Sequence, residues 1–257
     1  MELHGKNIIV TGGARGIGAA TARAYVGAGA RVAVLDILDE AGEALVHALN
    51  RQGPGTARYC HCDIARREDV DQTVDALVAE FGGLDVLANI AGVERHTPAE
   101  AITDDEWNLI FDVNVRGTLL TNQAAYRHMK GRGGRILNFG SDAGLVPYVN
   151  GAHYSAAKGA VFSWTRTIAH EWGRHGVTAN ALVPALWTPM YDEHRATFNA
   201  EQLAAHDAMM AGLIPVGGKL GDPDRDFAPL MVFLAGEGAR FINGQILSVN
   251  GGLNTVR

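Results

Sequence analysis

The sequence predicts an α/β protein whose parallel sheet of about seven strands carries helices on both faces. Two observations lead to this prediction. Short apolar runs rich in β-branched residues alternate along the chain with longer segments whose apolar residues recur at helical spacing. No linker, low-complexity run or internal repeat divides the 257 residues, so we expect one domain over 1–257. Strands and helices that alternate in this way form a doubly wound sheet.

Charge and hydropathy restrict the kinds of partner. The 22 basic and 28 acidic residues are spread along the chain and give a formal net charge of -6, without a basic stripe for nucleic acid or anionic lipid. No run reaches the ~18 apolar residues of a membrane span. The first residues lack the charged and apolar regions of a secretory leader. We therefore expect a cytoplasmic protein with a small-molecule partner and no membrane or nucleic-acid partner.

Metal ligands and disulfides are not expected. Cys60 and Cys62 are the only cysteines, and two positions apart in a predicted strand they are poorly placed to bridge. Free thiols in a reducing compartment are the better interpretation. The ten histidines form no His-Glu-x-x-His group, so no metal site is expected.

The first strand, residues 7–10, leads into a glycine-rich turn at 11–18 and an Ala-rich helix. Gly12, Gly16 and Gly18 would let the backbone pass close to a pyrophosphate, with the helix N-terminus directed at its charge. A glycine turn alone is weak evidence. The strand, turn and helix in this order favour nucleotide binding.

The second strand, residues 31–35, ends in an acid. Asp36 lies 18 residues after Gly18, where dinucleotide-binding folds place the acid that receives the adenosine ribose hydroxyls. Its charge would repel a 2′-phosphate, which favours NAD over NADP. Arg15 in the glycine turn favours NADP, because a basic side chain there can bind a phosphate. The residue after Asp36 is the apolar Ile37 and not a second basic residue, so we give Asp36 more weight and predict NAD.

Polar residues also follow the third and fourth strands, predicted at 56–62 and 84–88 after helices at 40–52 and 66–81. Asp63 and Asn89 therefore fall at the carboxyl edge of the sheet, where such folds bind ligands. Asp and Asn are also common in turns, so position alone assigns neither.

A long helix is expected from Thr103, which with Glu106 forms a capping-box pattern, to about Lys130. Asn114 lies inside it, where an amide is unfavourable unless it faces solvent or has a specific role. The strand predicted at 134–140 ends at Ser141, again at the carboxyl edge.

Tyr154 and Lys158 are four residues apart and share one face of a helix predicted at 154–174. A fixed cation beside a phenol favours the phenolate and would lower the pKa of Tyr154. Taken alone, the pair is also compatible with chance on an exposed face. His153 points off this face and is expected at the pocket rim or the surface.

The last third of the chain supplies a strand at 177–183, a helix at 223–235 and a strand at 245–249. Between them, apolar residues are scattered among polar ones over about 186–215. Such a segment can act as an adaptable lid over an apolar ligand, although core burial explains most of it equally well.

Together these motifs resemble the short-chain dehydrogenase/reductase family over essentially the whole chain. Residues 11–18 match its Thr-Gly-x-x-x-Gly-x-Gly turn, 89–92 its Asn-x-Ala-Gly motif and 154–158 its Tyr-x-x-x-Lys motif, with Ser141 and Asn114 in register. The resemblance implies a Rossmann-type fold and hydride transfer between NAD and a secondary alcohol or its ketone. The apolar segment after Pro184 favours an apolar, cyclic or aromatic substrate.

The resemblance also implies roles for the central residues. Tyr154 would exchange the proton of the substrate oxygen, which Ser141 would hold. Lys158 would lower the pKa of Tyr154 and bind the nicotinamide ribose. Asn114 would keep a water that links Lys158 to solvent.

Further contacts follow from the resemblance. Asp63 would contact adenine, Asn89 and Gly92 would lie beside a ribose, and Thr188 would bind the carboxamide or a phosphate. The cofactor contacts expected are Gly12, Arg15, Gly16, Ile17, Gly18, Asp36, Ile37, Cys62, Asp63, Ile64, Asn89, Ala91, Gly92, Tyr154, Lys158, Pro184, Ala185, Trp187 and Thr188. The substrate contacts expected are Ser141, Tyr154, Glu94, Leu186 and Trp187.

One departure from the family pattern concerns pocket shape. Ala185 follows Pro184 where the family commonly has Gly, and its methyl group could narrow the space beside the nicotinamide.

Several alternatives stay open. An NADP-dependent carbonyl reductase would use the same residues. The epimerase or dehydratase branch usually has Gly at the position of Arg15. A non-catalytic nucleotide-binding scaffold would share the fold but has no need of Ser141, Tyr154 and Lys158. A homotetramer is expected from the resemblance, with apolar surface from Trp164, Trp172 and Phe241.

Overall fold

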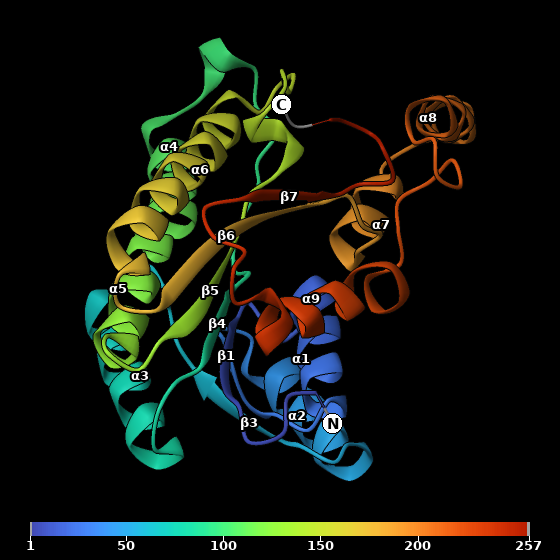
Figure 1. Ribbon diagram of the computed structural model, residues 1–257. Helices are drawn as coiled ribbons and strands as arrows, with labels where there is room; N and C mark the ends of the chain where they lie inside the picture. Colours follow the sequence, from blue (N-terminus) through green and yellow to red (C-terminus); the bar gives the residue numbers. More distant parts are fainter. Residues whose placement is uncertain (1, 256–257) are drawn as a thin grey trace.

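A seven-stranded sheet in the order β3-β2-β1-β4-β5-β6-β7 forms the centre of the computed structural model (Figure 1). The structure describes residues 2–255, apart from the side chain of His194. All neighbouring strands pair in parallel. The strands are β1 (Asn7–Thr11), β2 (Arg31–Asp36), β3 (Thr56–His61), β4 (Val86–Asn89), β5 (Gly134–Phe139), β6 (Val177–Pro184) and β7 (Ile246–Val249). The strand order reverses between β1 and β4, and such a switch point opens a ligand crevice at the carboxyl ends.

Helices cover both faces of the sheet, as the sequence predicts. In Figure 1, α3, α4, α5 and α6 lie on one side, and α1, α2 and α9 lie on the other. Their bounds are α1 (Gly16–Gly27), α2 (Asp39–Gln52), α3 (Arg67–Phe81), α4 (Asp104–Phe111), α5 (Gly117–Met129), α6 (Ala152–Gly173) and α9 (Ala228–Ala235). Short helical turns are η1 (Ala99–Ala101), η2 (Asp112–Arg116), η3 (Asp142–Gly144), η4 (Pro223–Phe227) and η5 (Glu237–Ala239).

An apolar core lies on each face of the sheet. Val10 of β1 belongs to the cluster that contains Tyr25 and Phe227, whereas its neighbour Ile9 belongs to the cluster that contains Leu120. All five of these side chains are less than 2% exposed. Because both faces are buried, the central strands are apolar at consecutive positions.

The helix predicted from Thr103 to Lys130 is continuous in space but irregular. Thr103 and Glu106 form the predicted capping box, with a 3.2 Å bond from the Glu106 N–H to the Thr103 hydroxyl. The π-helical turn η2 then separates α4 from α5. A π turn shifts the side chains that follow it and often occurs at functional sites. The predicted helix at 223–235 likewise contains the π-helical turn η4.

The segment after β6 forms two helices, α7 (Pro189–Arg195) and α8 (Ala200–Leu213). None of the α8 residues is buried, and Figure 1 shows α8 standing away from the sheet. The two helices hold each other: the Tyr191 hydroxyl lies 2.6 Å from His206 Nε2, and Arg195 forms an ion pair with Asp207.

Both ends of this segment meet beside the sheet. Leu186 pairs with Gly221 in an isolated parallel bridge. The Trp187 N–H donates to the Gly221 carbonyl at 2.8 Å, and the Gly221 N–H donates to the Ala185 carbonyl at 3.1 Å. The chain therefore leaves and rejoins the body at one place.

One aromatic residue expected at the surface is buried instead. Trp172 is 9% exposed because its ring stacks on Tyr126, with centroids 4.1 Å apart. Phe241, in contrast, is 98% exposed.

Within residues 2–255, no helix combines the length and the apolar character that a membrane span requires.

Candidate active site

The glycine turn between β1 and α1 is shaped so that side chains do not fit. A Cβ at Gly12, where φ is +62°, would lie 2.6 Å from the Ala91 Cα. A Cβ at Gly18 would lie 2.0 Å from the Gly12 carbonyl oxygen. The N-terminus of α1 has no side-chain cap and no acid in its first turn, so its backbone N–H groups can bind an anion. These features fit a pyrophosphate.

Asp36 is fixed beside this turn by backbone donors. Its Oδ2 accepts from the Ala14 N–H at 3.0 Å, and its Oδ1 accepts from the N–H groups of Ile37 at 2.8 Å and Leu38 at 3.2 Å. Oδ2 accepts only one of these bonds and has a further lone pair that can receive a hydroxyl. The 59% exposed Ile37 provides apolar surface next to it. This arrangement fits the ribose and adenine of a dinucleotide.

Arg15, which argues for NADP, has an acidic neighbour. Its Nη1 lies 3.7 Å from Glu193 Oε1 of α7, and both side chains are exposed. The charge of Glu193 partly offsets the guanidinium, which weakens the case for a bound 2′-phosphate.

The residues after β3 present mainly backbone to the edge of the sheet. Cys62 and Ile64 are 2% and 6% exposed and pack in the core. Asp63 Oδ1 accepts from the Ala65 N–H at 3.0 Å. Both cysteines are free thiols, and burial raises the pKa of Cys62 to about 11, so this thiol is unreactive at neutral pH.

Asn89 has its side chain turned into the protein. Its Oδ1 accepts from the hydroxyls of Thr11 and Thr121, both at 3.0 Å. Its Nδ2 donates to the hydroxyl of Thr118 at 3.2 Å and to Asn138 Oδ1 at 3.3 Å. The side chain therefore joins β1, β4, β5 and α5, and the structure does not direct it toward a ligand.

Asn114 is buried, at 1% exposure, so the exposed alternative is wrong. Its Nδ2 donates to the carbonyls of Val93 at 2.8 Å and Ile110 at 3.0 Å, and its Oδ1 accepts from the Val93 N–H at 3.3 Å. The π turn places the amide against the loop after β4. A Cβ at Gly92 would lie 2.7 Å from Asn114 Oδ1 and 3.4 Å from Lys158 Nζ, so this position requires a small residue.

Ser141, Tyr154 and Lys158 meet at the carboxyl edge next to this loop. Lys158 is 4% exposed, and its Nζ donates to the Phe139 carbonyl at the end of β5 at 3.0 Å. The same Nζ lies 5.5 Å from the centre of the Tyr154 ring. The Ser141 hydroxyl accepts from the Ala143 N–H at 3.2 Å and is near enough to the phenol to act on its pKa.

In these surroundings the pKa of Tyr154 is raised, and the lowering by Lys158 that the sequence predicts stays a prediction. Burial, followed by the negative charge of Glu94, raises the pKa of Tyr154 above its usual value, and the Ser141 hydroxyl opposes this only in part. Burial also lowers the pKa of Lys158 to about 8, against an opposing effect of Glu94. A cation that is itself titrating near pH 8 stabilises a phenolate less than a permanent charge would.

His153, expected at the rim or the surface, is fully buried. Because α6 begins at Ala152, His153 lies in its first turn and faces inward. Neither ring nitrogen has a hydrogen-bond partner within the described part of the chain. A second base at the pocket rim is therefore not formed by this residue.

Glu94 lies at the site, and it contacts two residues that the sequence analysis did not indicate, Tyr148 and His96. The Tyr148 hydroxyl donates to Glu94 Oε1 at 2.6 Å, and His96 Nε2 lies 3.2 Å from the same oxygen. The Tyr148 ring in turn lies 6.3 Å from that of Tyr154. The sequence feature that could have indicated Tyr148 is that it is an aromatic residue in the loop between Ser141 and Tyr154.

The residues after β6 divide into two groups. Leu186 is 6% exposed and packs in the core, so the structure does not bring its side chain to the site. Ala185 continues the sheet through a 3.0 Å bond from its N–H to the Val249 carbonyl. Trp187 donates from Nε1 to Asp192 at 2.8 Å, and the Thr188 hydroxyl accepts from the Tyr191 N–H at 3.3 Å, which fixes the start of α7.

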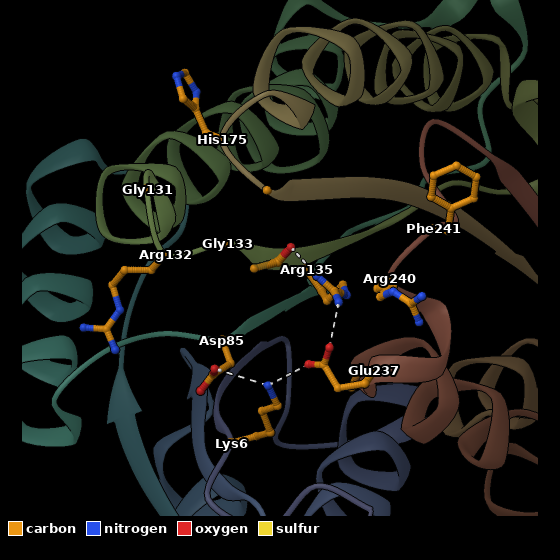
Figure 2. Close-up of a pocket in the computed structure, with 13 residues that line it drawn as sticks. Lys6, Asp85, Gly131, Arg132, Gly133, Arg135, His175, Glu237, Arg240 and Phe241 are labelled. Atoms are coloured by element: carbon orange, nitrogen blue, oxygen red, sulfur yellow. Dashed lines mark hydrogen bonds and ion pairs between the residues drawn. The ribbon is translucent and has the colours of Figure 1, made fainter.

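A separate cavity of about 540 Å³ lies at the opposite, amino-terminal edge of the strands (Figure 2). Lys6 lies there between two acids, with Nζ 3.6 Å from Asp85 Oδ1 and 3.1 Å from Glu237 Oε1. Figure 2 shows Arg135 directed at the same Glu237. Because this cavity is on the far edge from Tyr154, it is not part of the candidate site.

Among residues 2–255, His, Cys, Asp and Glu side chains form no group of three or more suited to a metal ion.

Comparison with known proteins agrees with this geometry. A family model described as short chain dehydrogenase matches residues 6–198. The chain is 40% identical over 251 residues to the short-chain reductase protein NovJ of Streptomyces niveus, a match that covers 95% of this chain and 92% of NovJ. It is 39% identical over 259 residues to a 2,5-dichloro-2,5-cyclohexadiene-1,4-diol dehydrogenase of Sphingobium indicum, with 99% of each chain covered. A solved dehydrogenase/reductase from Sinorhizobium meliloti has a TM-score of 0.87 at 33% identity and covers 99% of this chain and 97% of that chain.

Proposed function

The chain belongs to the short-chain dehydrogenase/reductase family, and from this premise we propose that it is an NAD-dependent oxidoreductase that interconverts a secondary alcohol and its ketone. One observation carries the proposal. Ser141, Tyr154 and Lys158 converge at the carboxyl edge of the sheet, next to a turn with no room for a side chain at Gly12 or Gly18.

The cofactor, when bound, accepts or supplies a hydride. The backbone N–H groups at the start of α1 would hold its pyrophosphate, and Asp36 would receive the ribose hydroxyls. Preference for NAD is supported by the carboxylate of Asp36 and by the acid, Glu193, beside Arg15. The other predicted cofactor contacts, including Thr188, remain part of this proposal.

Tyr154 would exchange the proton of the substrate oxygen while Ser141 holds that oxygen. Its raised pKa keeps the phenol protonated at neutral pH, which suits proton donation to a ketone. In the direction of oxidation it must first lose a proton. Lys158, with a pKa of about 8, can take up or release a proton near pH 8. Asn114, held by its bonds to the Val93 backbone, would position the water through which this proton reaches solvent.

The substrate is proposed to be an apolar, cyclic compound. The name of the Sphingobium relative, a cyclohexadiene diol dehydrogenase, supports a cyclic substrate, and the name of NovJ, a reductase, keeps both directions open. The segment 186–215 would act as a lid. Met190 and Met209 are 43% and 53% exposed on α7 and α8 and offer adaptable apolar surface for this purpose.

A cytoplasmic homotetramer is also part of the proposal. Phe241 is almost fully exposed, and a groove of about 320 Å³ between α4, α5 and α6 is lined by Phe111, Val115, Leu119 and Trp164. Such apolar surfaces favour contact between copies. Light scattering at micromolar concentration checks this, and a monomer would contradict it.

The test of the function is a panel of secondary alcohols with NAD or NADP, read as absorbance of the reduced cofactor. We expect turnover of cyclic secondary alcohols with NAD and little with NADP. Preference for NADP would favour the carbonyl reductase instead. Cofactor binding without turnover of any alcohol or ketone would favour the non-catalytic scaffold.

A further inference from the structure

We propose that Glu94 determines substrate specificity: its carboxylate accepts a hydrogen bond from a second hydroxyl group, so that the substrate is a diol and the product a hydroxy ketone. This inference rests on the proposed function and adds the class of substrate. It is carried by the contacts of Glu94 and by its place beside the phenol of Tyr154.

Glu94 lies in a polar wall formed with His96 and Tyr148. The Tyr148 hydroxyl donates to Oε1 at 2.6 Å, and His96 Nε2 lies 3.2 Å from the same atom. The carboxylate is partly buried, with 23% of its side chain exposed. Both of these contacts are made to Oε1, and within residues 2–255, leaving aside the side chain of His194, no hydrogen bond is found to the other oxygen, Oε2, which can therefore accept one from a ligand.

This wall borders the reacting group. The Tyr148 ring lies 6.3 Å from the Tyr154 ring. The charge of Glu94 also acts on both partners of the proton-exchanging pair, because it raises the pKa of Tyr154 and opposes the lowering of the pKa of Lys158. A ring whose reacting oxygen is at Tyr154 can therefore place a second polar group at Glu94.

The wall is held in place by contacts between the two loops that form it. The Thr97 N–H donates to the Asn150 carbonyl at 2.7 Å, and the Thr97 hydroxyl donates to Glu106 Oε1 at 3.0 Å. Asn150 has a φ of +60°, a conformation that Asn adopts more readily than most residues. A preorganised acceptor binds a ligand without first having to be ordered.

The chemistry of an ionised carboxylate decides what it binds. It only accepts hydrogen bonds, so it binds a hydroxyl well, gains nothing from a carbonyl and repels a second carboxylate. During oxidation, the hydride of one carbinol carbon goes to NAD and the proton of its hydroxyl goes to Tyr154. The second hydroxyl keeps its proton and remains bonded to Glu94.

The test compares three six-membered rings as substrates with NAD: cyclohexanol, cis-cyclohexane-1,2-diol and 2-hydroxycyclohexanecarboxylate. The readout is the ratio of kcat/KM values between two substrates within one protein, which cancels general losses of activity. For the wild type we expect about 10- to 100-fold preference for the diol over cyclohexanol, the range for a hydrogen bond to a charged group.

Two variants of Glu94 separate its hydrogen bond from its charge. Glu94→Ala should reduce the diol-to-cyclohexanol ratio to near one. Glu94→Gln should raise kcat/KM for the hydroxy acid relative to cyclohexanol, because the like charge is gone. A gain on one substrate cannot result from misfolding. The matched control is Glu100→Gln, an exposed acid on the same segment, which should leave both ratios unchanged.

A binding measurement supplies a readout without turnover. In the inactive Tyr154→Phe background loaded with NAD, calorimetry should give a diol Kd about 10- to 100-fold higher when Glu94→Ala is added. A ratio near one in the wild type, or ratios that do not change in the Glu94 variants, would overturn the inference while the function stands. No turnover of any of the three rings by the wild type, with no diol binding, would overturn the function and the inference together.

Discussion

The ammonium of Lys158 lies 5.5 Å from the centre of the Tyr154 ring while it donates a 3.0 Å hydrogen bond to the end of β5. The lysine is thereby fixed to the same strand that leads into Ser141. The Tyr154 phenol, the Lys158 ammonium and the Ser141 hydroxyl are thus positioned by one helix and the end of one strand, so their mutual geometry does not depend on the segment that carries α7 and α8.

The first prediction concerns Tyr154. Tyr154→Phe should lower kcat by about 10²- to 10⁴-fold, the contribution of a positioned acid or base. NAD should still bind with a similar Kd, because the change removes one hydroxyl and leaves the glycine turn intact. Steady-state rates and calorimetry measure the two effects. Tyr126→Phe, which removes a hydroxyl bonded to His175 far from the site, is the control. Retained turnover in Tyr154→Phe would exclude Tyr154 as the proton donor.

The second prediction concerns cofactor choice. Asp36→Ala should weaken NAD binding by about tenfold, the effect of losing about 1.4 kcal/mol, and should improve NADP binding by removing a like charge. Calorimetry with both dinucleotides checks the reversal of preference. Glu40→Gln, an exposed acid at the start of α2, should change neither Kd. Tighter binding of NADP than of NAD by the wild type would show that Arg15 outweighs Asp36.

The third prediction concerns pH. Oxidation requires the phenolate of Tyr154, whose pKa is raised by burial and by Glu94. The rate of oxidation should therefore increase from neutral to alkaline pH, and the rate of ketone reduction should decrease. In Glu94→Gln, with cyclohexanol as substrate, the rising limb should move to lower pH because one negative charge beside the phenol is lost. Rate profiles of kcat/KM in both directions measure this. If the rising part of the pH profile does not move in Glu94→Gln, the charge of Glu94 does not affect the titration of Tyr154.

The fourth prediction concerns stability at alkaline pH. Burial lowers the pKa of Lys158 to about 8, so between this value and the unfolded value the unfolded chain binds more protons than the native one. Stability should therefore rise with pH in this window. Relative to Lys158→Met, the wild type should gain about 2 kcal/mol between pH 7 and pH 10, measured by urea unfolding. Lys130→Met, at the surface, controls for loss of a charge. A constant difference between wild type and Lys158→Met would contradict the lowered pKa.

The fifth prediction concerns the buried imidazole of His153. A buried polar group without a partner destabilises a protein by about 1–3 kcal/mol. His153→Leu should therefore raise the free energy of unfolding by about 1 kcal/mol and the Tm by a few degrees, measured by thermal unfolding. His170→Leu, exposed on the same helix, should have little effect. A clear loss of stability in His153→Leu would mean that the imidazole has a partner that its geometry does not indicate.

The sheet could be predicted from the sequence because its strands are buried on both faces, and such strands are continuous apolar runs. The order of motifs along the chain likewise predicted that Asp36, Ser141 and Tyr154 would meet at one edge, since parallel strands end on the same side.

Orientation within helices was predicted less well. His153, in the first turn of a helix that begins at Ala152, is buried, and so is Asn114 in the π turn, for which the sequence left open solvent exposure or a specific role. The start of α6 has no side-chain cap that would mark it in the sequence, unlike that of α4, and a π turn has no reliable sequence pattern. Trp172 is buried because Tyr126, distant in sequence, stacks on it. The contact of Glu94 with Tyr148 joins two loops 54 positions apart, and local patterns carry no information about such pairs.

The bridge between Leu186 and Gly221 closes the segment that carries α7 and α8 at its base. These bonds, together with that from the Val216 N–H to the Gly251 carbonyl, hold both ends of the segment against the sheet, so added length between α7 and α8 costs little loop-closure entropy. Insertions or replacements within 187–220 can change the surface that this segment presents while β6 and β7 keep their register. The same sheet can therefore carry a differently shaped segment at this place, with Ser141, Tyr154 and Lys158 left unaltered.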